Sequence, residues 1–426
     1  MRTPNRRCGH TVRQSIVRVI VRASALGAAL ATLTLPIPAH AEFLWRLSGS
    51  SQYESNNNVF DLDNRALSDT YLAYGAEADV IYLFGRQNLY ARVDAKQINY
   101  QKYSGLNHNE YDVVTRFIWK LTSDMDGLLG VVRTHAMVPF LDTARSGSDF
   151  SLSTVTTQAE QATFNLKVSP LWGLTAEGDR TEFRQPSPGQ PDVQLTDNAG
   201  KLTLNYFGLG KLTTGFMGSY STGGYDGSST NASTVNPATE NPSYEQLQAS
   251  FVSSFSSGRT VYTGTLGYTS RSSSDTQDKT SGITGSLDFI YRLTPKTSYR
   301  LKIDRAVNNY LANAGSELDS SIGGGISWKP SAKLSVGGDY TWVYREFPAQ
   351  GLLPGQSRTD HQQSVSLSLG YQPTRWMIVG LYGNYQTRGS NQQGLNVDAT
   401  VYGISVTVQT ADQSNAESVP MESHWH

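Results

Sequence analysis

Polar and apolar residues alternate with a period of two in several segments of the chain. In segment 333–345 one face reads Leu334, Val336, Gly338, Tyr340, Trp342 and Tyr344, and the other reads Lys333, Ser335, Gly337, Asp339, Thr341, Val343 and Arg345. Segments 89–98 and 299–304 separate charged from apolar residues in the same way. An α-helix would mix these faces, because its side chains repeat every 3.6 residues. The pattern predicts β-strands that have water on one face and apolar surroundings on the other.

The connections between these segments alternate between short and long. The short ones are rich in turn residues and lie at 84–88, 169–171, 208–210, 256–258, 294–296, 329–331 and 372–374. The long ones are rich in Ser, Gly, Asn and Asp and lie at 54–69, 139–154, 185–196, 222–243 and 347–360. Aromatic residues flank the short turns: Tyr82, Tyr90, Trp119, Trp172, Tyr291, Tyr299, Trp328, Tyr371 and Trp376. Short periplasmic turns, long outer loops and aromatic girdles are typical of outer-membrane barrels.

The fold class follows from these connections. Beyond residue 41 no apolar stretch approaches the roughly 20 residues of a membrane-spanning helix. Counting alternating segments gives about 18 strands, within a range of about 16–18, each long enough to cross a bilayer when tilted. We therefore predict an all-β fold, a transmembrane antiparallel β-barrel over residues 42–409 with both ends in the periplasm. A barrel of that size leaves an aqueous lumen unless loops fill it.

The two ends of the chain differ from the barrel. Residues 1–41 carry six arginines and no acidic residue, then an apolar run over 23–35 and a small-residue motif that ends at Ala41. This order predicts a signal peptide cleaved between Ala41 and Glu42, and so an outer-membrane location. A single anchoring helix is the alternative, but the apolar run is shorter than a bilayer requires. Residues 410–426 are polar, and we expect a disordered periplasmic tail.

Charge and cysteine content exclude several classes of function. Without residues 1–41 the chain keeps 29 basic residues against 36 acidic ones, a formal charge of −7, which does not suit nucleic-acid binding. The only cysteine, Cys8, leaves with the signal peptide. No histidine lies in a zinc-binding pattern, so we expect no metal and no cofactor.

No local signature of catalysis occurs in the sequence. There is no nucleophile elbow, phosphate-binding loop or dinucleotide-binding glycine pattern in a strand-to-helix context. We therefore predict that the protein is not an enzyme. An outer-membrane barrel enzyme remains the weaker alternative, with His135 as the only candidate histidine well inside a strand.

Charged residues on the predicted inward faces are the chemically distinctive group. They carry both signs and are Glu77, Asp79, Arg92, Asp94, Lys96, Arg116, Arg133, Asp179, Arg180, Arg300, Lys302, Asp304, Asp339 and Arg345. One interpretation is a solvated wall whose charges pair across strands, since a charge facing lipid costs ~2–4 kcal/mol at mid-bilayer. The other is a hydrogen-bonding track for a hydroxyl-rich polymer. The sequence leaves both open.

The start of the barrel also resembles a known family. Residues 53–60 read Tyr-Glu-Ser-Asn-Asn-Asn-Val-Phe, Leu67-Ser-Asp-Thr70 and Gly85-Arg-Gln-Asn-Leu89 follow, and a long hairpin spans 100–119. Over residues 43–140 the chain resembles the EpsL family, which comprises outer-membrane barrels of exopolysaccharide biosynthesis operons within the type 2 β-barrel porin group.

The resemblance implies export of a secreted polysaccharide through a barrel surrounded by outer-membrane lipid. It also implies partners in a periplasmic export or synthesis machinery. The alternative function is a general diffusion porin for small polar solutes, which needs no such partner.

Overall fold

The computed structural model describes residues 41–63, 66–138, 140, 152–186, 193–226, 243–274, 279–310, 315–347 and 357–410. The predicted signal peptide, apart from Ala41, and the predicted tail, apart from Thr410, lie outside these residues. Both therefore remain predictions. The first strand begins at Ala41 and the last ends at Gln409.

The described residues form 18 strands and one short 3₁₀ helix, η1 (Ser104–Leu106). The first nine strands are β1 (Ala41–Asn56), β2 (Asp69–Phe84), β3 (Gln87–Tyr100), β4 (His108–Lys120), β5 (Met125–Met137), β6 (Thr154–Lys167), β7 (Trp172–Gln185), β8 (Val193–Leu209) and β9 (Leu212–Asp226). The second nine are β10 (Ser243–Ser256), β11 (Thr260–Ser273), β12 (Lys279–Thr294), β13 (Thr297–Tyr310), β14 (Gly315–Ser331), β15 (Leu334–Phe347), β16 (Arg358–Thr374), β17 (Met377–Ser390) and β18 (Val397–Gln409).

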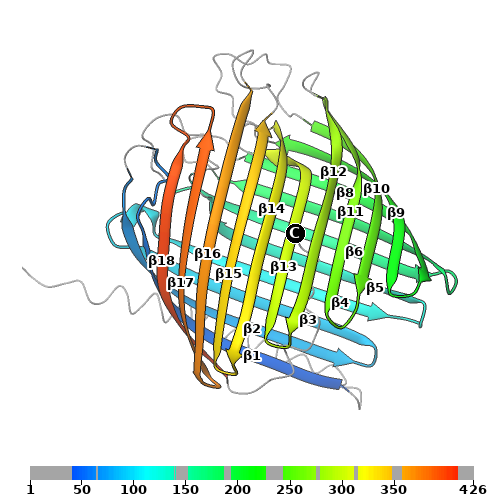
Figure 1. Cartoon of the computed structure of the whole chain (residues 1–426), viewed down its shortest axis with the longest axis horizontal. Coiled ribbons are helices and arrows are strands. Elements are labelled where there is room, and N and C mark those ends of the chain that lie inside the picture. The colour runs from blue at the N-terminus through cyan, green and yellow to red at the C-terminus, as the bar shows by residue number, and fades with distance from the viewer. Residues whose placement is uncertain are drawn as a thin grey trace, which may run out of the picture.

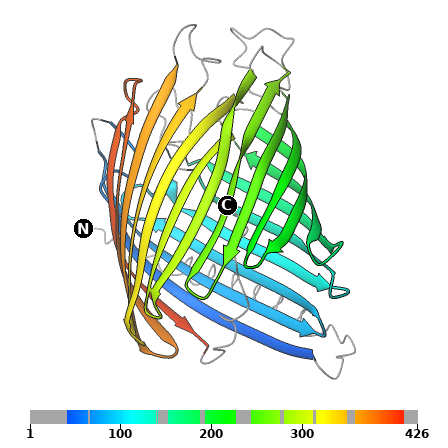
Figure 2. The ribbon, with the colours of Figure 1, turned by 45° about the vertical axis from the view of Figure 1, so that its right-hand side comes forward.

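Each strand pairs with its neighbours in sequence, and all pairs are antiparallel. β1 pairs with β2 on one side and with β18 on the other, so the sheet closes on itself. Figures 1 and 2 show the tilted strands running around this closed wall. Pairing of β18 with Ser48–Asn56 of β1 closes the seam of the sheet along these residues, as a barrel in a bilayer requires. The prediction of an antiparallel barrel with 18 strands is confirmed.

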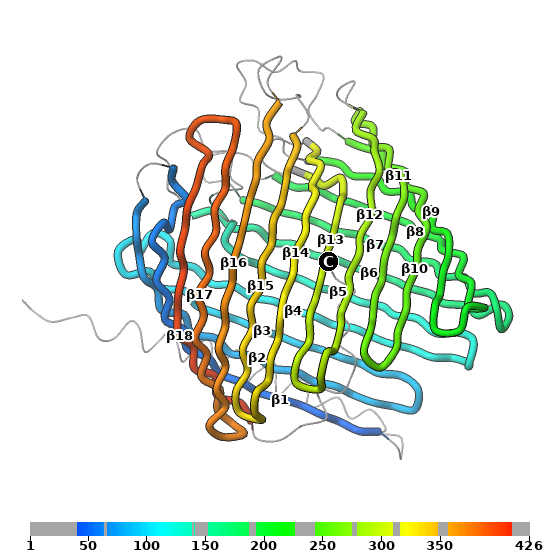
Figure 3. Tube along the Cα trace, in the orientation of Figure 1, coloured from blue at the N-terminus to red at the C-terminus, as the bar shows by residue number. Residues whose placement is uncertain are grey.

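Tight hairpins join the strands at one end of the barrel. Figure 3 shows the β12–β13, β14–β15 and β16–β17 turns together at the lower end of the view. Two of the tight turns need a residue with positive φ, and glycine supplies it: Gly85 has φ +62° and Gly210 has φ +71°. Both lie within the short connections predicted from the sequence.

The pairing register sorts the wall into two faces. On one face large apolar side chains lie side by side, as in the row of directly paired Phe216, Phe251 and Leu266. Phe216 is 69% exposed and Leu266 is 63% exposed, an exposure that suits contact with lipid. The opposite face carries the charged networks described below, and a charge would cost ~2–4 kcal/mol against lipid at mid-bilayer. We call these the lipid face and the lumen face.

Most aromatic residues near the short turns follow the girdle pattern, with one exception. Trp172 and Trp328 are exposed on the lipid face, at 44% and 47%. Tyr90 instead shares the lumen face with Arg92. It is buried against Leu44 and Ile81, and its hydroxyl donates to Asp79 Oδ1 at 3.0 Å. The phenol provides the hydrogen bond that this buried carboxylate needs, so Tyr90 is a lumen residue rather than a girdle residue.

Candidate functional site: the lumen wall

A charged network crosses the lumen face of the first three strands. Arg46 on β1 donates through Nε to Asp79 Oδ2 at 3.0 Å and through Nη2 to Glu77 Oε1 at 3.0 Å. Arg92 on β3 reaches the other oxygen of Glu77, with an Nη2–Oε2 distance of 3.0 Å. Each of these cations approaches a carboxylate on β2 from a different side. The network therefore joins three strands and leaves little net charge on this part of the wall.

A second charged group lies on β7 and β8. Lys201 Nζ contacts Asp179 Oδ2 at 2.8 Å and also donates to Glu177. One cation thus serves two carboxylates, and this part of the lumen face keeps an excess of negative charge.

A third charged group spans β12 to β15. Arg300 Nη2 donates to Asp288 Oδ2 at 2.6 Å, and Arg345 Nε lies 3.6 Å from Asp319 Oδ2. The register places Lys302 directly opposite Asp288 and Asp339 opposite Gly325. Both signs alternate across these strands, so this part of the wall presents no single charge.

Twelve of the fourteen residues predicted to face inward share the lumen face. By register these are Glu77, Asp79, Arg92, Asp94, Lys96, Arg116, Asp179, Arg300, Lys302, Asp304, Asp339 and Arg345.

Arg133 and Arg180 differ from the prediction. Arg133 alternates with Leu129 and Val131 on β5, and Arg180 pairs directly with Glu160 on β6. Both arginines therefore belong to the lipid face. Successive strand residues point to opposite sides, so Asp179 and Arg180 cannot both face the lumen. On β7 the sequence is charged at both of these positions, and this obscured the alternation.

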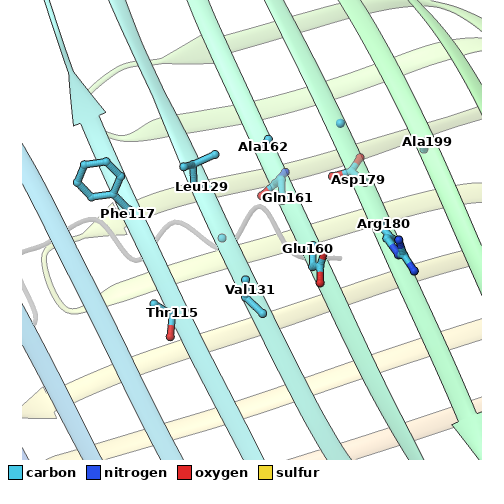
Figure 4. A pocket seen from close by; sticks show the side chains of 12 residues that line it. Thr115, Phe117, Leu129, Val131, Glu160, Gln161, Ala162, Asp179, Arg180 and Ala199 are labelled. Carbon is cyan, nitrogen blue, oxygen red and sulfur yellow. The ribbon is translucent and has the colours of Figure 1, made fainter. Parts of the chain in front are cut away.

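Arg180 lines a pocket of about 530 Å³ in the wall of β4 to β8. Phe117, Leu129, Val131 and Glu160 line it from neighbouring strands (Figure 4). Arg180 also donates to Glu182, one of its neighbours on the same face. The ion pair with Glu182 reduces the cost of both charges on the lipid face.

His135 also lies on the lipid face. Its ring stacks on Tyr111 with centroids 5.4 Å apart, and its Nδ1 lies 2.9 Å from Thr156 Oγ1. The contacts with Tyr111 and Thr156 pack the ring between β4 and β6. Among the described residues, no group of three or more His, Cys, Asp or Glu is placed to hold a metal ion.

Sequence reasoning missed several lumen charges. Arg46 lies between Trp45 and Leu47, so a strand alternation would have placed it inward. Lys201 precedes Leu202 and Leu204 in the same way. The buried network of Arg358, Asp360 and Arg388 joins β16 to β17. No sequence signal marks that cluster, because it forms from strand ends about 30 residues apart.

Hydroxyl and amide groups line further stretches of the lumen face. On β10 to β12, Thr265 Oγ1 lies 2.9 Å from Ser286 Oγ, and Gln248 donates to Ser250 at 3.0 Å. On β16 and β17, Asn384 donates to Ser364 at 3.0 Å and to Ser366 at 2.7 Å. These groups are held in order by one another and keep further donor and acceptor capacity toward the lumen.

The end of β13 is anchored through Asn309 at the long-loop end of the barrel. Asn309 Nδ2 donates to Tyr244 Oη at 3.0 Å and approaches Asp197 Oδ2 at 3.4 Å. Arg271 donates to Asn309 Oδ1 at 2.7 Å and covers the ring of Tyr244. These contacts link β13 to β8, β10 and β11. They hold the end of β13 against residues of the lumen face.

Comparison with known proteins supports the porin class. A family model described as "Putative beta-barrel porin 2" matches residues 253–410, which contain strands β11 to β18. The comparison with curated proteins finds no match. Among the described residues no helix has the length and apolar character to cross a membrane. The chain is an outer-membrane-type β-barrel, and its second half is similar to this porin family.

Solved structures with a similar fold include iron transporters. The FrpB iron transporter of Neisseria meningitidis, F5-1 variant, aligns with a TM-score of 0.50 at 10% identity, covering 86% of this chain and 82% of that chain. The F3-3 variant aligns with a TM-score of 0.47 at 10% identity, over 86% and 81% of the two chains. A mutant ferric enterobactin receptor of Pseudomonas aeruginosa gives 0.45 at 10% identity, over 85% and 81%. At such identities the likeness shows the fold alone.

Proposed function

We propose that the barrel conducts a secreted exopolysaccharide across the outer membrane. The observation that carries this proposal is the lining of the lumen face, in which hydroxyl and amide groups lie between charges that are largely paired with one another. Sugar hydroxyls can exchange water for such groups at little net cost, because each hydrogen bond contributes only about 0.5–1.5 kcal/mol net. A wall of this kind can hold a hydroxyl-rich chain weakly at many points and still let it move.

The resemblance of residues 43–140 to EpsL barrels supports the same proposal. The family model that matches residues 253–410 is a porin model and does not name a polymer. It favours the competing function, a general diffusion porin for small polar solutes. The two functions differ in partners, since an exporter needs a periplasmic machinery that delivers the polymer.

A deletion strain tests the proposal. We expect loss of surface polysaccharide, measured by polymer staining and by sugar analysis of the medium, with normal growth on small nutrients at limiting concentration. A copy of the gene carried on a plasmid should restore the polymer. Normal polymer together with slowed nutrient uptake would instead support the diffusion porin.

A further inference from the structure

Cations gather at the short-turn end of the barrel. Each of the eight short hairpins carries a Lys or Arg in its turn or in the adjoining strand end. All ten of these side chains are exposed: Arg86, Lys120, Lys167, Lys211, Arg259, Arg292, Lys296, Lys329, Lys333 and Arg375. This concentration stands out in a chain that carries a formal charge of −7 without residues 1–41. The short-turn end is therefore an electropositive rim.

The cations are densest in four successive turns, from β10–β11 to β16–β17. We call this group the basic arc: Arg259, Arg292, Lys296, Lys329, Lys333 and Arg375. Segments 256–260, 292–297, 329–334 and 372–377 contain no Asp or Glu. The other half of the rim differs, since Glu42, Asp124 and Asp126 lie among its cations.

The backbone holds the cations of the basic arc close to one another. The backbone amide of Arg292 donates to the carbonyl oxygen of Arg259 at 2.7 Å, and the backbone amide of Lys329 donates to the carbonyl oxygen of Lys296 at 2.7 Å. Two ammonium groups bridge to the next turn, Lys296 Nζ to Pro330 O at 3.1 Å and Lys333 Nζ to Pro373 O at 3.2 Å. Like charges fixed at such spacing repel, and an anion that spans several turns would relieve that repulsion.

The strand phase directs Arg292 and Lys329 toward the mouth of the lumen. Arg292 alternates with Tyr291, which pairs with Tyr299 on the lipid face, and Arg292 itself pairs with Ser298 on the lumen face. Lys329 follows Trp328, which is 47% exposed on the lipid face. The aromatic side chains thus mark the membrane boundary. The neighbouring cations lie beyond it, on the side of the aqueous entrance.

We propose that the basic arc captures a polyanionic polysaccharide at the periplasmic mouth, one with carboxylate or similar acidic groups on successive sugars. This inference rests on the proposed export function and adds the charge of the polymer. A concentrated positive field raises the local concentration of a polyanion and its rate of encounter, and salt screens the effect. Deeper in the lumen the charges are largely paired, apart from the excess of negative charge around Lys201 on β7 and β8, so the wall there offers no second attraction for a polyanion. The arc therefore selects at the entrance and leaves passage to the hydroxyl lining.

The test is binding of labelled oligogalacturonate to the purified full-length barrel in neutral detergent, followed by fluorescence anisotropy, with labelled dextran as the neutral probe. The arc variant combines Arg292→Gln, Lys296→Gln, Lys329→Gln and Lys333→Gln. The matched control combines Arg86→Gln, Lys120→Gln, Lys167→Gln and Lys211→Gln, which removes the same charge from the other half of the rim. Heat-modifiable migration on gels establishes that each variant folds.

We expect the arc variant to bind oligogalacturonate about tenfold more weakly than the wild type, given the modest energy of each exposed ion pair. The control variant should lose much less, and dextran should bind none of the three proteins measurably. If the arc variant fails to fold, the affinity of the wild-type barrel for oligogalacturonate at low and high salt still tests the proposal. The proposal requires that high salt weaken this binding strongly. Binding that is insensitive to salt, or an equal loss in both variants, overturns it.

Lipid is the competing ligand. An arc variant that binds oligogalacturonate normally but loses affinity for phosphatidylglycerol vesicles would assign the arc to lipid headgroups and overturn the proposal. The deletion strain separates this failure from failure of the export function. If the deletion strain lacks surface polymer but the purified wild-type barrel does not bind oligogalacturonate, the export function stands and the acidic nature of the polymer is rejected.

Discussion

Placing a charge on each face of one strand tests the assignment of the lipid and lumen faces. Leu367 lies near the middle of β16 and is 65% exposed on the lipid face. Ser368, the next residue, is exposed on the lumen face opposite Gly337, which has no side chain to obstruct a larger neighbour. Leu367→Arg and Ser368→Arg therefore introduce the same side chain one position apart, on opposite sides of the wall.

The expected difference follows from the position of Leu367. An arginine at the bilayer midplane on the lipid face costs about 2–4 kcal/mol, which lowers the folded-to-unfolded ratio roughly 30- to 700-fold. Ser368→Arg should change the free energy of unfolding by less than about 1 kcal/mol, because the lumen hydrates the new charge.

Urea unfolding in lipid vesicles, followed by tryptophan fluorescence and by gel migration, measures both variants. We expect a clearly lower unfolding midpoint for Leu367→Arg than for Ser368→Arg. Equal midpoints, or a larger loss for Ser368→Arg, would refute the assignment of the two faces.

Three further predictions concern the lumen network, the end of β13 and the mature terminus. Arg46→Gln leaves two carboxylates on β2 with one cation fewer, so reversal potentials in a salt gradient should shift toward cation preference; Arg133→Gln, on the lipid face, should produce no shift. Asn309→Ala removes the group that anchors the end of β13 and should lower the free energy of unfolding in urea by about 1–3 kcal/mol, more than Asn308→Ala does; equal losses would deny the anchor. N-terminal sequencing of the outer-membrane fraction should begin at Glu42, and an uncleaved inner-membrane form would exclude the signal peptide.

The architecture could be predicted because period-two alternation and turn chemistry are local properties of the chain. The face that carries Tyr340 and Trp342 on β15 is apparent from one segment alone. The count of about 18 strands came from the alternating segments and from the short and long connections between them, and Gly, Pro or Ser marks each of the short connections named from the sequence. Closure then followed from the physics of a bilayer, which tolerates no unpaired strand edge.

The lumen site was harder, because its chemistry depends on register and on contacts between distant strands. Where both faces of a strand are charged, as at Asp179 and Arg180, alternation cannot assign a side. Only the pairing of Arg180 with Glu160 does so. The contact of Asn309 with Asp197 joins residues 112 positions apart, and no local pattern predicts it. The basic arc is visible in the sequence, yet it becomes one surface only when the turns lie side by side.

Photo-crosslinking in living cells tests most directly whether polymer passes through the lumen. A photoreactive amino acid is placed at 368 on the lumen face or at 367 on the lipid face, and cells are irradiated while they secrete polysaccharide. We expect adducts of the barrel with polymer, detected by sugar staining of the purified protein, from position 368 and not from position 367. Active secretion without an adduct at 368, or equal adducts at both positions, would contradict transport of the polymer through this barrel.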